Sequence, residues 1–306
     1  MKHAFLIIAH NELEVLKALI SLLDNRNNDL YIHMDKKFKT WNENELKKCA
    51  KRSKIKVLSE ISVNWGDASQ VECQYLLLRS AFAGEYDYYH FLSGADLPLK
   101  SNLDIHTFFR KHAGKQFIHF DSPVAGKEAL NRVMYRHPFG KYLKCTRYKT
   151  VTKVLFLTDD FLVKIQTVLG LKRKLYYETI QKGCNWCSIT KEFADYVLRE
   201  EKKVMVMLKK SLCGDEIFIQ TLCVNSPFIH QLYDKVFSNN YNACKRLIIW
   251  NEENRKSPKV LREEDWGRLL NTSSLFGRKF SMDKQKDFTQ RWISHIRTEN
   301  RRSIVR

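Results

Sequence analysis

Apolar runs and helical patterns alternate along the first 60 residues. Ala4–Ala9 is a continuous apolar run, which is typical of a strand buried on both faces of a parallel sheet. Apolar residues then recur at helical spacing over Leu13–Leu23. A short strand, a helix and another short strand are predicted next, at Leu30–Met34, Trp41–Lys51 and Ile55–Leu58. This order predicts a βαβαβ unit with right-handed crossovers.

The later pattern continues this α/β alternation. A long amphipathic helix is predicted over Ser69–Phe82, and the aromatic run Tyr86–Leu92 is strongly β-prone. The region Asp121–Lys182 is basic and irregular, with one helix expected over Asp159–Leu169. The remaining elements are strands at Cys184–Thr190 and Lys245–Trp250, and helices at Lys191–Glu200 (capped by Thr190), Asp265–Leu270 and Phe288–Arg306.

Polar residues follow the first strands of the predicted sheet. Ligands of such sheets bind beyond the carboxyl ends of the strands, where this chain places His10, Asp35 and the segment Val63–Ser69. The sequence contains neither GxGxxG nor GxxxxGKS, so the dinucleotide and P-loop types of phosphate site are absent. Asp35 either accepts hydrogen bonds from a ribose or a base, or caps a helix.

The turn after Tyr86–Leu92 carries a single carboxylate. Ser93–Lys100 contains a Gly-x-Asp turn followed by Pro, which predicts a sharp strand exit with Asp96 at the edge of the sheet. Many nucleotide-sugar transferases hold Mn²⁺ or Mg²⁺ there with an Asp-x-Asp pair. This turn offers no second carboxylate, so Asp96 is either a structural turn residue or part of a site in which cations replace the metal.

Two adjacent carboxylates begin the stretch Gly214–Phe228. Asp215 and Glu216 follow a glycine and precede an apolar run, where a helix is expected to begin. Acidic residues in a first helical turn complement the macrodipole by about 0.3–1 kcal/mol, which is the simpler interpretation. The functional interpretation is that Glu216 is a positioned general base.

The chain is strongly basic. Lys and Arg exceed Asp and Glu by 53 − 34 = 19, which predicts attraction to polyanions such as nucleic acid, an anionic membrane face or a phosphorylated small molecule. The Tyr- and Arg-rich region Asp121–Lys182 resembles a single-strand-binding surface in composition. It carries no recognised nucleic-acid-binding motif, so an acceptor-binding region is preferred and no nucleic-acid partner is expected.

The cysteines and the apolar runs limit other classes of function. Eight cysteines are dispersed through 306 residues, and Cys184 and Cys187 form a CxxC spacing without a second pair, so free thiols and no metal are expected. The first apolar run has only six residues, which predicts a cytoplasmic protein. The basic amphipathic helix Phe288–Arg306 is either a solvated surface or a membrane contact.

An ordered set of motifs resembles the Core-2/I-branching enzyme family, glycosyltransferase family 14, which includes β-1,6-N-acetylglucosaminyltransferases and peptide xylosyltransferases. The matching pieces span nearly the whole chain outside Asp121–Lys182. They are Ala4–His10, Tyr31–Asp35, Val63–Gly66 with Ser69, Tyr86–Lys100, Gly183–Phe193, Asp215–Thr221 with Asn225 and Ser226, and Leu275–Phe280.

The resemblance implies a GT-A fold, with a Rossmann-like mixed central sheet flanked by helices. It implies an inverting transfer from a UDP-sugar to a glycan hydroxyl, with no divalent metal or other cofactor. We expect one domain over residues 1–306: a nucleotide-binding half (1–120), a variable acceptor-side insertion (121–182) and a catalytic and diphosphate-binding half (183–306).

The resemblance also assigns individual residues. Glu216 falls on the catalytic base, Asp35 on the acid that contacts uracil or ribose, and Trp65 on a position beside the nucleotide. Lys279 matches a cation that neutralises the diphosphate, with Lys256 or Arg255 as the second. We further place His10 and Asp96 with the donor, and Trp186, Arg132 and Tyr135 with the acceptor.

The biological setting is expected to be bacterial surface polysaccharide synthesis, at the inner membrane face. A lipid-diphosphate-linked oligosaccharide is a compatible acceptor for a basic protein, because anionic lipid attracts Lys and Arg. The donor sugar stays open among GlcNAc, xylose and galactose forms. The alternatives from other classes are a nucleic-acid-binding protein and a non-catalytic peripheral membrane protein.

Overall fold

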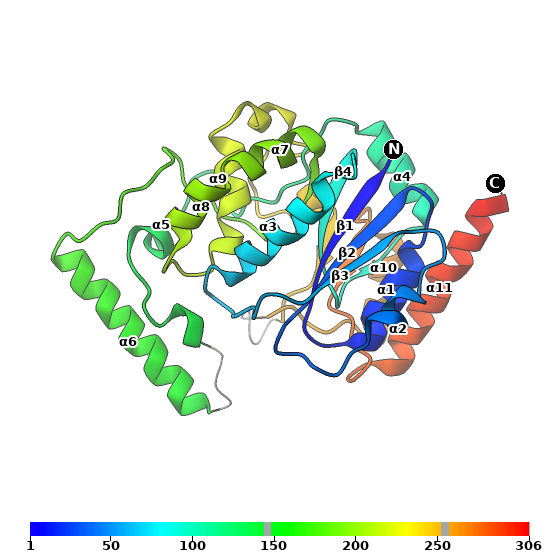
Figure 1. Cartoon of the computed structure of the whole chain (residues 1–306), viewed down its shortest axis with the longest axis horizontal. Coiled ribbons are helices and arrows are strands. Elements are labelled where there is room, and N and C mark those ends of the chain that lie inside the picture. Colours follow the sequence, from blue (N-terminus) through cyan, green and yellow to red (C-terminus); the bar gives the residue numbers. More distant parts are fainter. Residues whose placement is uncertain (144–147, 252–256, 306) are drawn as a thin grey trace.

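The structure, a computed structural model, describes residues 1–143, 148–251 and 257–305. At its centre lies a five-stranded sheet in the order β3-β2-β1-β4-β6 (Figure 1). The first four strands in this order are parallel and β6 is antiparallel to β4. Their bounds are His3–Ala9 (β1), Asn28–Met34 (β2), Ile55–Leu58 (β3), Tyr88–Ser93 (β4) and Ser188–Thr190 (β6). The predicted mixed, Rossmann-like sheet is confirmed.

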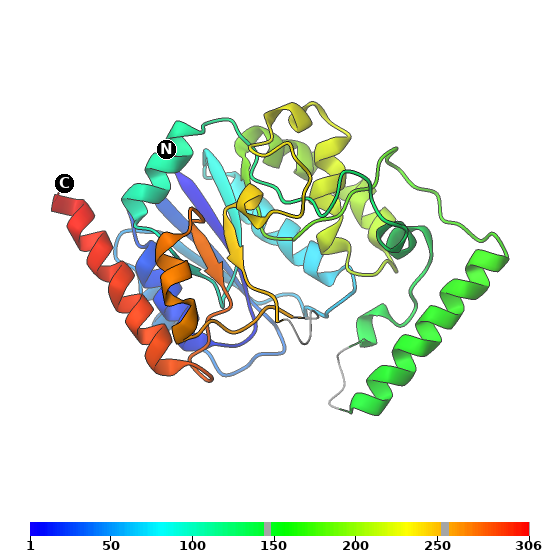
Figure 2. The same cartoon turned by 180° about the vertical axis from the view of Figure 1, so that it is seen from behind.

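Strand β1 divides the interior into two cores. Ala4, Leu6 and Ile8 enter the first core, with α3, α7, α8 and α9. The intervening residues of β1 enter the second core, with α1, α4 and α11. Figures 1 and 2 show these two groups of helices on opposite sides of the sheet. Burial on both faces explains the unbroken apolar run of β1.

The helices agree with the pattern in most places. Both α3 and β3 have the predicted bounds, and Thr190 caps α7 by accepting a hydrogen bond from the Phe193 amide at 3.4 Å. The α-helices that flank the sheet are α1 (Leu13–Leu23), α2 (Glu43–Lys47), α3 (Ser69–Phe82), α4 (Asn102–Lys111), α7 (Lys191–Arg199), α8 (Glu201–Leu208), α9 (Phe218–Val224), α10 (Trp266–Asn271) and α11 (Lys286–Val305).

Some helices and strands differ in length from the elements predicted from the sequence. Helix α6 (Lys149–Val168) begins ten residues before the predicted start, and α5 (Lys127–Met134) precedes it. Helix α2 is shorter than predicted at both ends, and its start is set by Asn42, which caps it by accepting a hydrogen bond from the Asn44 amide at 2.9 Å. The predicted strand Cys184–Thr190 is reduced to β6, because the Cys184 amide donates to the His119 ring at 3.1 Å instead of to a strand partner.

A small second sheet extends the carboxyl edge of the first. It contains β5 (Leu97–Pro98), β8 (Phe276–Arg278) and β7 (Arg246–Ile248), in the order β5-β8-β7. The Phe280 amide donates to the Ala95 carbonyl at 3.0 Å, which holds the end of β8 beside the exit of β4. Short 3₁₀ helices lie at Gly140–Tyr142, Gly214–Glu216, Pro227–Gln231, Tyr241–Cys244 and Glu263–Asp265.

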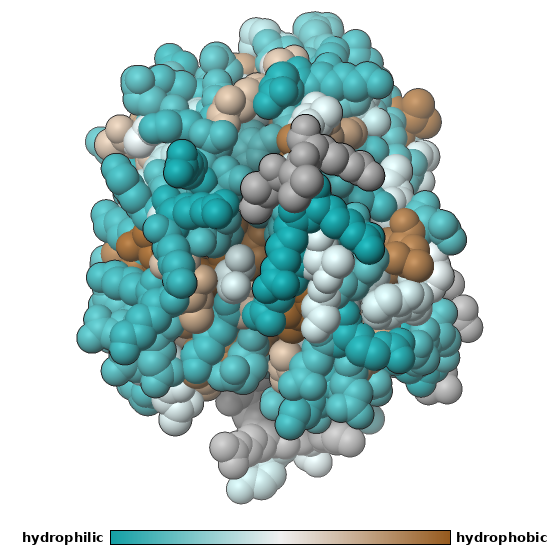
Figure 3. All heavy atoms as spheres, turned by 90° about the vertical axis from the view of Figure 1, so that its right-hand side faces the viewer, coloured by the Kyte–Doolittle hydropathy of each residue, from teal (hydrophilic) through white to brown (hydrophobic). Residues whose placement is uncertain are grey.

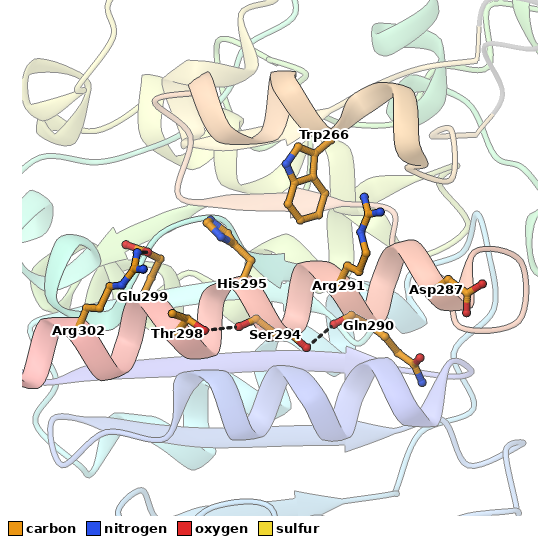
Figure 4. Close-up of a pocket in the computed structure, with 9 residues that line it drawn as sticks. All are labelled: Trp266, Asp287, Gln290, Arg291, Ser294, His295, Thr298, Glu299 and Arg302. Carbon is orange, nitrogen blue, oxygen red and sulfur yellow. Dashed lines mark hydrogen bonds and ion pairs between the residues drawn. The ribbon is translucent and has the colours of Figure 1, made fainter.

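The C-terminal helix α11 buries its apolar side. Phe288, Trp292 and Ile296 are at most 4% exposed in the second core, and the Trp292 indole donates to the Pro98 carbonyl at 3.1 Å. Trp266 of α10 points toward α11 beside a groove of about 630 Å³ (Figure 4). The face of the molecule on this side is mainly hydrophilic (Figure 3). The apolar side of α11 thus packs against the second core over the residues whose burial the structure describes.

Candidate active site

The polar residues after the parallel strands meet at one edge of the sheet. The Asp35 amide donates to the Ala9 carbonyl at 2.8 Å, and the Gly94 amide donates to the Ile8 carbonyl at 2.9 Å. These bonds bring the exits of β1, β2 and β4 together. A Cβ on Gly94 would lie 2.7 Å from the Ala9 Cβ, so the approach of β4 to β1 requires glycine. His10, Asp35 and Asp96 consequently surround one location, as predicted.

Asp35 organises a loop and caps no helix. The residue is 5% exposed, and its carboxylate accepts a hydrogen bond from the Lys37 amide at 2.9 Å. The Lys37 ammonium donates to the Val63 carbonyl at 2.6 Å and to the Asn64 side chain at 3.0 Å. The next helix is capped by Asn42 instead. The Asp35 turn is thereby joined to the segment that carries Trp65.

Two consecutive cations lie at the end of β8. Arg278 places its Nε 3.4 Å from an Asp96 carboxylate oxygen, and its guanidinium lies 4.5 Å from the centre of the Trp186 ring. Lys279 follows directly and is half-buried. Sequence reasoning assigned Lys279 to the site and missed Arg278, although both stand in the same motif between buried aromatic residues. The predicted alternatives for a second cation, Lys256 and Arg255, lie outside the described residues.

These groups influence each other electrostatically. Burial and the neighbouring Arg278 lower the pKa of Lys279. The pKa of His10 is lowered mainly by desolvation and secondly by the charge of Lys279. The charge of Asp35 raises this pKa and opposes the shift. Burial raises the pKa of Asp96, and Arg278 opposes this shift. A concentration of positive charge beside His10 is a suitable place for an anionic ligand.

Glu216 lies in a 3₁₀ turn, Gly214–Glu216, that precedes helix α9. One carboxylate oxygen, Oε2, is 2.7 Å from Arg132 Nη1 and 3.8 Å from Lys182 Nζ. The side chain is 35% exposed, so it is both held and reachable from solvent. Glu216 is thus an acid in the first turn of a 3₁₀ helix, and ion pairs hold its carboxylate as well.

Asp215 has a different environment from its neighbour. The residue is 8% exposed and accepts a hydrogen bond from the Asn185 side chain at 2.8 Å. Burial, followed by the charge of Glu216, raises the pKa of Asp215 to about 7. A substantial share of Asp215 is thus protonated at neutral pH, which leaves Glu216 as the carboxylate available for chemistry.

The segment Gly183–Cys187 connects Glu216 with the cation pair. The Gly183 amide donates to the Glu216 carbonyl at 2.9 Å, and three residues later Trp186 lies against Arg278. On the other side of the turn, the Cys213 amide donates to the Gly66 carbonyl at 2.8 Å. These contacts link the Asp35 loop, through the segment of Trp65, to Glu216, Trp186 and Arg278. The charges of Arg278 and Lys279 in turn act on His10.

The predicted acceptor residues have different roles in the structure. Arg132 forms ion pairs with both Glu216 and Glu128, each at 2.7 Å, so it orients the candidate base. Trp186 is 8% exposed and supports Arg278, while Tyr135 is 3% exposed and packs in the interior. Trp65 is 40% exposed and lies beside Phe156 of α6, with the ring centres 6.2 Å apart.

Neither the groove beside α11 nor a metal site overlaps the described residues at this edge of the sheet. The groove between α10 and α11 is lined by none of the residues predicted for donor or acceptor binding. Within the part of the chain that the structure describes, no three His, Cys, Asp or Glu side chains converge as metal ligands. We therefore take the sheet edge, with its cations and Glu216, as the candidate active site.

Comparisons with known proteins show what this chain is similar to. The family described as Core-2/I-branching enzyme matches residues 3–269. Xylosyltransferase 2 of Canis lupus familiaris is 23% identical over 302 residues, covering 90% of this chain and 31% of its own length. Xylosyltransferase of Ciona intestinalis is 20% identical over 313 residues, covering 95% and 33%. The chain thus spans about a third of the length of these relatives.

A weak likeness to a solved structure was also found. Mouse xyloside xylosyltransferase 1, in its apo form, matches with a TM-score of 0.37 and 9% identity, covering 90% of this chain and 96% of that one. A score at this level supports no further conclusion.

Proposed function

Because the chain belongs to the Core-2/I-branching enzyme family, we propose that it transfers a sugar from a UDP-sugar to a hydroxyl group of a glycan acceptor, with inversion at the anomeric carbon. The observation that carries this proposal is that the segment Gly183–Trp186 contacts Glu216 at one end and Arg278, the neighbour of Lys279, at the other. Glu216 supplies a base, and Arg278 and Lys279 supply positive charge.

Glu216 acts as the general base. In an inverting transfer the acceptor oxygen attacks the anomeric carbon from the side opposite the nucleotide, and a carboxylate must take the hydroxyl proton as the new bond forms. Both ion pairs that the described residues make with Glu216 end on Oε2. Arg132 and Lys182 thereby hold Oε2, and Oε1 is proposed to take the proton of the acceptor hydroxyl.

Arg278 and Lys279 stabilise the departing diphosphate. Negative charge develops on the β-phosphate as the glycosidic bond of the donor breaks, and preorganised cations lower the energy of that transition state. Arg278 is preorganised by Trp186 and by Asp96. Because two cations serve this purpose, the transfer is proposed to proceed without a divalent metal.

Asp35 and Trp65 contribute to the nucleotide side of the site. Asp35 sits at the carboxyl end of β2 with one of its oxygens bound to the Lys37 amide. Its other oxygen is proposed to accept a hydrogen bond from the ribose or the uracil. Trp65, which is 40% exposed, offers an aromatic face beside that position.

The proposed acceptor is an anionic glycan carrier, such as an oligosaccharide on a lipid diphosphate in the synthesis of a surface polysaccharide. The net charge of +19 supports an acceptor of this kind. Placement in the cytoplasm at the inner membrane face stays a prediction, and the donor sugar stays open among GlcNAc, xylose and galactose forms.

The proposal is tested by Glu216→Gln. Release of UDP is measured with a panel of UDP-sugars, and UDP affinity is measured by calorimetry. Loss of the base is expected to lower turnover by about 10²–10⁴-fold while UDP affinity changes little. Glu128→Gln is the matched control, since it removes the other carboxylate that pairs with Arg132. Full activity in Glu216→Gln would disprove the assignment.

A further inference from the structure

Helix α6 carries a continuous apolar stripe on its outer side. The stripe consists of Val154, Leu157, Phe161, Ile165 and Val168, which are 55%, 60%, 61%, 38% and 86% exposed. Their spacing of three and four residues places all five on one side of the helix. Figures 1 and 2 show α6 standing away from the central sheet, at the opposite end of the molecule from α11.

The opposite side of α6 is anchored to the protein. The Asp159 carboxylate lies 2.6 Å from His137 Nδ1, and Val163 is 9% exposed. Gln166 binds the backbone of Arg136 at both its amide and its carbonyl, each at 2.9 Å. One side of the helix is thus fixed by specific contacts, which leaves the apolar stripe facing outward.

The charge around α6 identifies the kind of surface that complements it. Residues 148–174 contain six Lys and Arg and two Asp, a net charge of 6 − 2 = +4. Of the two acids, Asp159 is buried against His137 and Asp160 pairs with Lys164 at 2.7 Å. Helix α6 contains three of these cations and both Asp, and the other three cations (Lys172, Arg173 and Lys174) follow it closely. An apolar helical stripe with basic residues beside it is typical of segments that lie in an anionic membrane interface. A second copy of the chain would bring like charges together.

We propose that α6 docks the protein on an anionic lipid bilayer, with the stripe Val154–Val168 inserted among the headgroups. Among the described residues, no helix is long and apolar enough to cross a membrane, so the contact is at the surface. Phe156 of α6 touches Trp65 at the candidate active site. Docking through α6 therefore holds that site near the membrane, where a lipid-linked acceptor would be found; this last step rests on the proposed function.

The experiment is co-sedimentation of the full chain with vesicles of phosphatidylcholine, with and without phosphatidylglycerol. The wild type is expected to bind only the vesicles that contain phosphatidylglycerol. Leu157→Glu combined with Phe161→Glu should weaken that binding by about tenfold or more, because each change removes an inserted side chain and adds repulsion. Val236→Glu with Leu270→Glu is the matched control, since both residues are exposed and lie outside α6.

The outcomes separate this inference from the proposed function. Glu216→Gln should bind vesicles like the wild type, and the α6 variant should still release UDP from a UDP-sugar in solution. Equal vesicle binding by the α6 variant and the wild type would overturn the proposal. It would also be overturned by a wild-type dimer in sedimentation velocity that the α6 variant dissociates, because the stripe would then bind a second copy.

Discussion

Asp215→Asn is expected to make the protein more stable at alkaline pH and nearly unchanged at acidic pH. Burial of Asp215, followed by the negative charge of Glu216, raises the pKa of Asp215 from an ordinary value of 3.8 to about 7. Between these two values the unfolded chain releases the proton and the native protein retains it. The free energy of unfolding contributed by this group therefore falls as the pH rises from about 4 to about 7.

The size of the effect follows from the two pKa values. Integration of the proton linkage between pH 5 and pH 8 gives a loss of about 2.5 kcal/mol in the wild type. If the native pKa of Asp215 were one unit lower, the loss of unfolding free energy over this pH range would still be about 1.4 kcal/mol. Asparagine does not titrate, and its carbonyl can accept the same hydrogen bond from Asn185. The variant is therefore expected to lack this part of the pH dependence.

Urea unfolding of both proteins at several pH values between 5 and 8 measures the difference. Subtracting the two curves cancels the contribution of the buried histidines, whose pKa values are lowered by burial. Repeating the pair in a Glu216→Gln background should reduce the effect, because the charge that raises the pKa of Asp215 is gone. Parallel curves for wild type and Asp215→Asn would refute the reasoning.

Three further predictions concern the candidate active site. Gly183→Ala should destabilise the protein by about 2 kcal/mol or more and lower UDP release, because a Cβ there would lie 1.8 Å from the His119 carbonyl oxygen. Gly267→Ala, which meets nothing within 4 Å, is its control, and equal melting temperatures would contradict the prediction. Arg278→Lys should weaken UDP binding by about threefold to tenfold, since it loses the planar contact with Trp186. Calorimetry with EDTA and with Mg²⁺ should give the same wild-type affinity, and a strict need for Mg²⁺ would argue against the paired cations.

The sequence predicted the parts of the fold that rest on local patterns. The buried strand β1 and helix α3 follow from an unbroken apolar run and from helical spacing, and both were found where expected. His10, Asp35 and Asp96 meet because the ends of parallel strands must share one edge. The position of these three residues at one edge of the sheet was therefore predictable from the sequence.

The contacts between distant segments could not be predicted. Arg132 lies 84 residues before Glu216, and no spacing rule indicates that its guanidinium holds that carboxylate. Arg278 was overlooked because its value depends on Trp186, which reaches it only in the folded chain. The apolar pattern of α11 suggested a membrane surface, but tertiary packing covers it, while the exposed stripe lies on α6.

The division of the interior by β1 also bears on how such an enzyme can diversify. Among the described residues, the buried members of the second core come from 5–117 and 247–296. The segment 121–182 contributes only to the first core, through Val133, Tyr177 and Ile180. Mutations that reshape α5 or α6 can thus accumulate without disturbing the core that supports Lys279. Under the proposed function, selection can change the acceptor and the membrane contact while the residues proposed to bind the donor are kept.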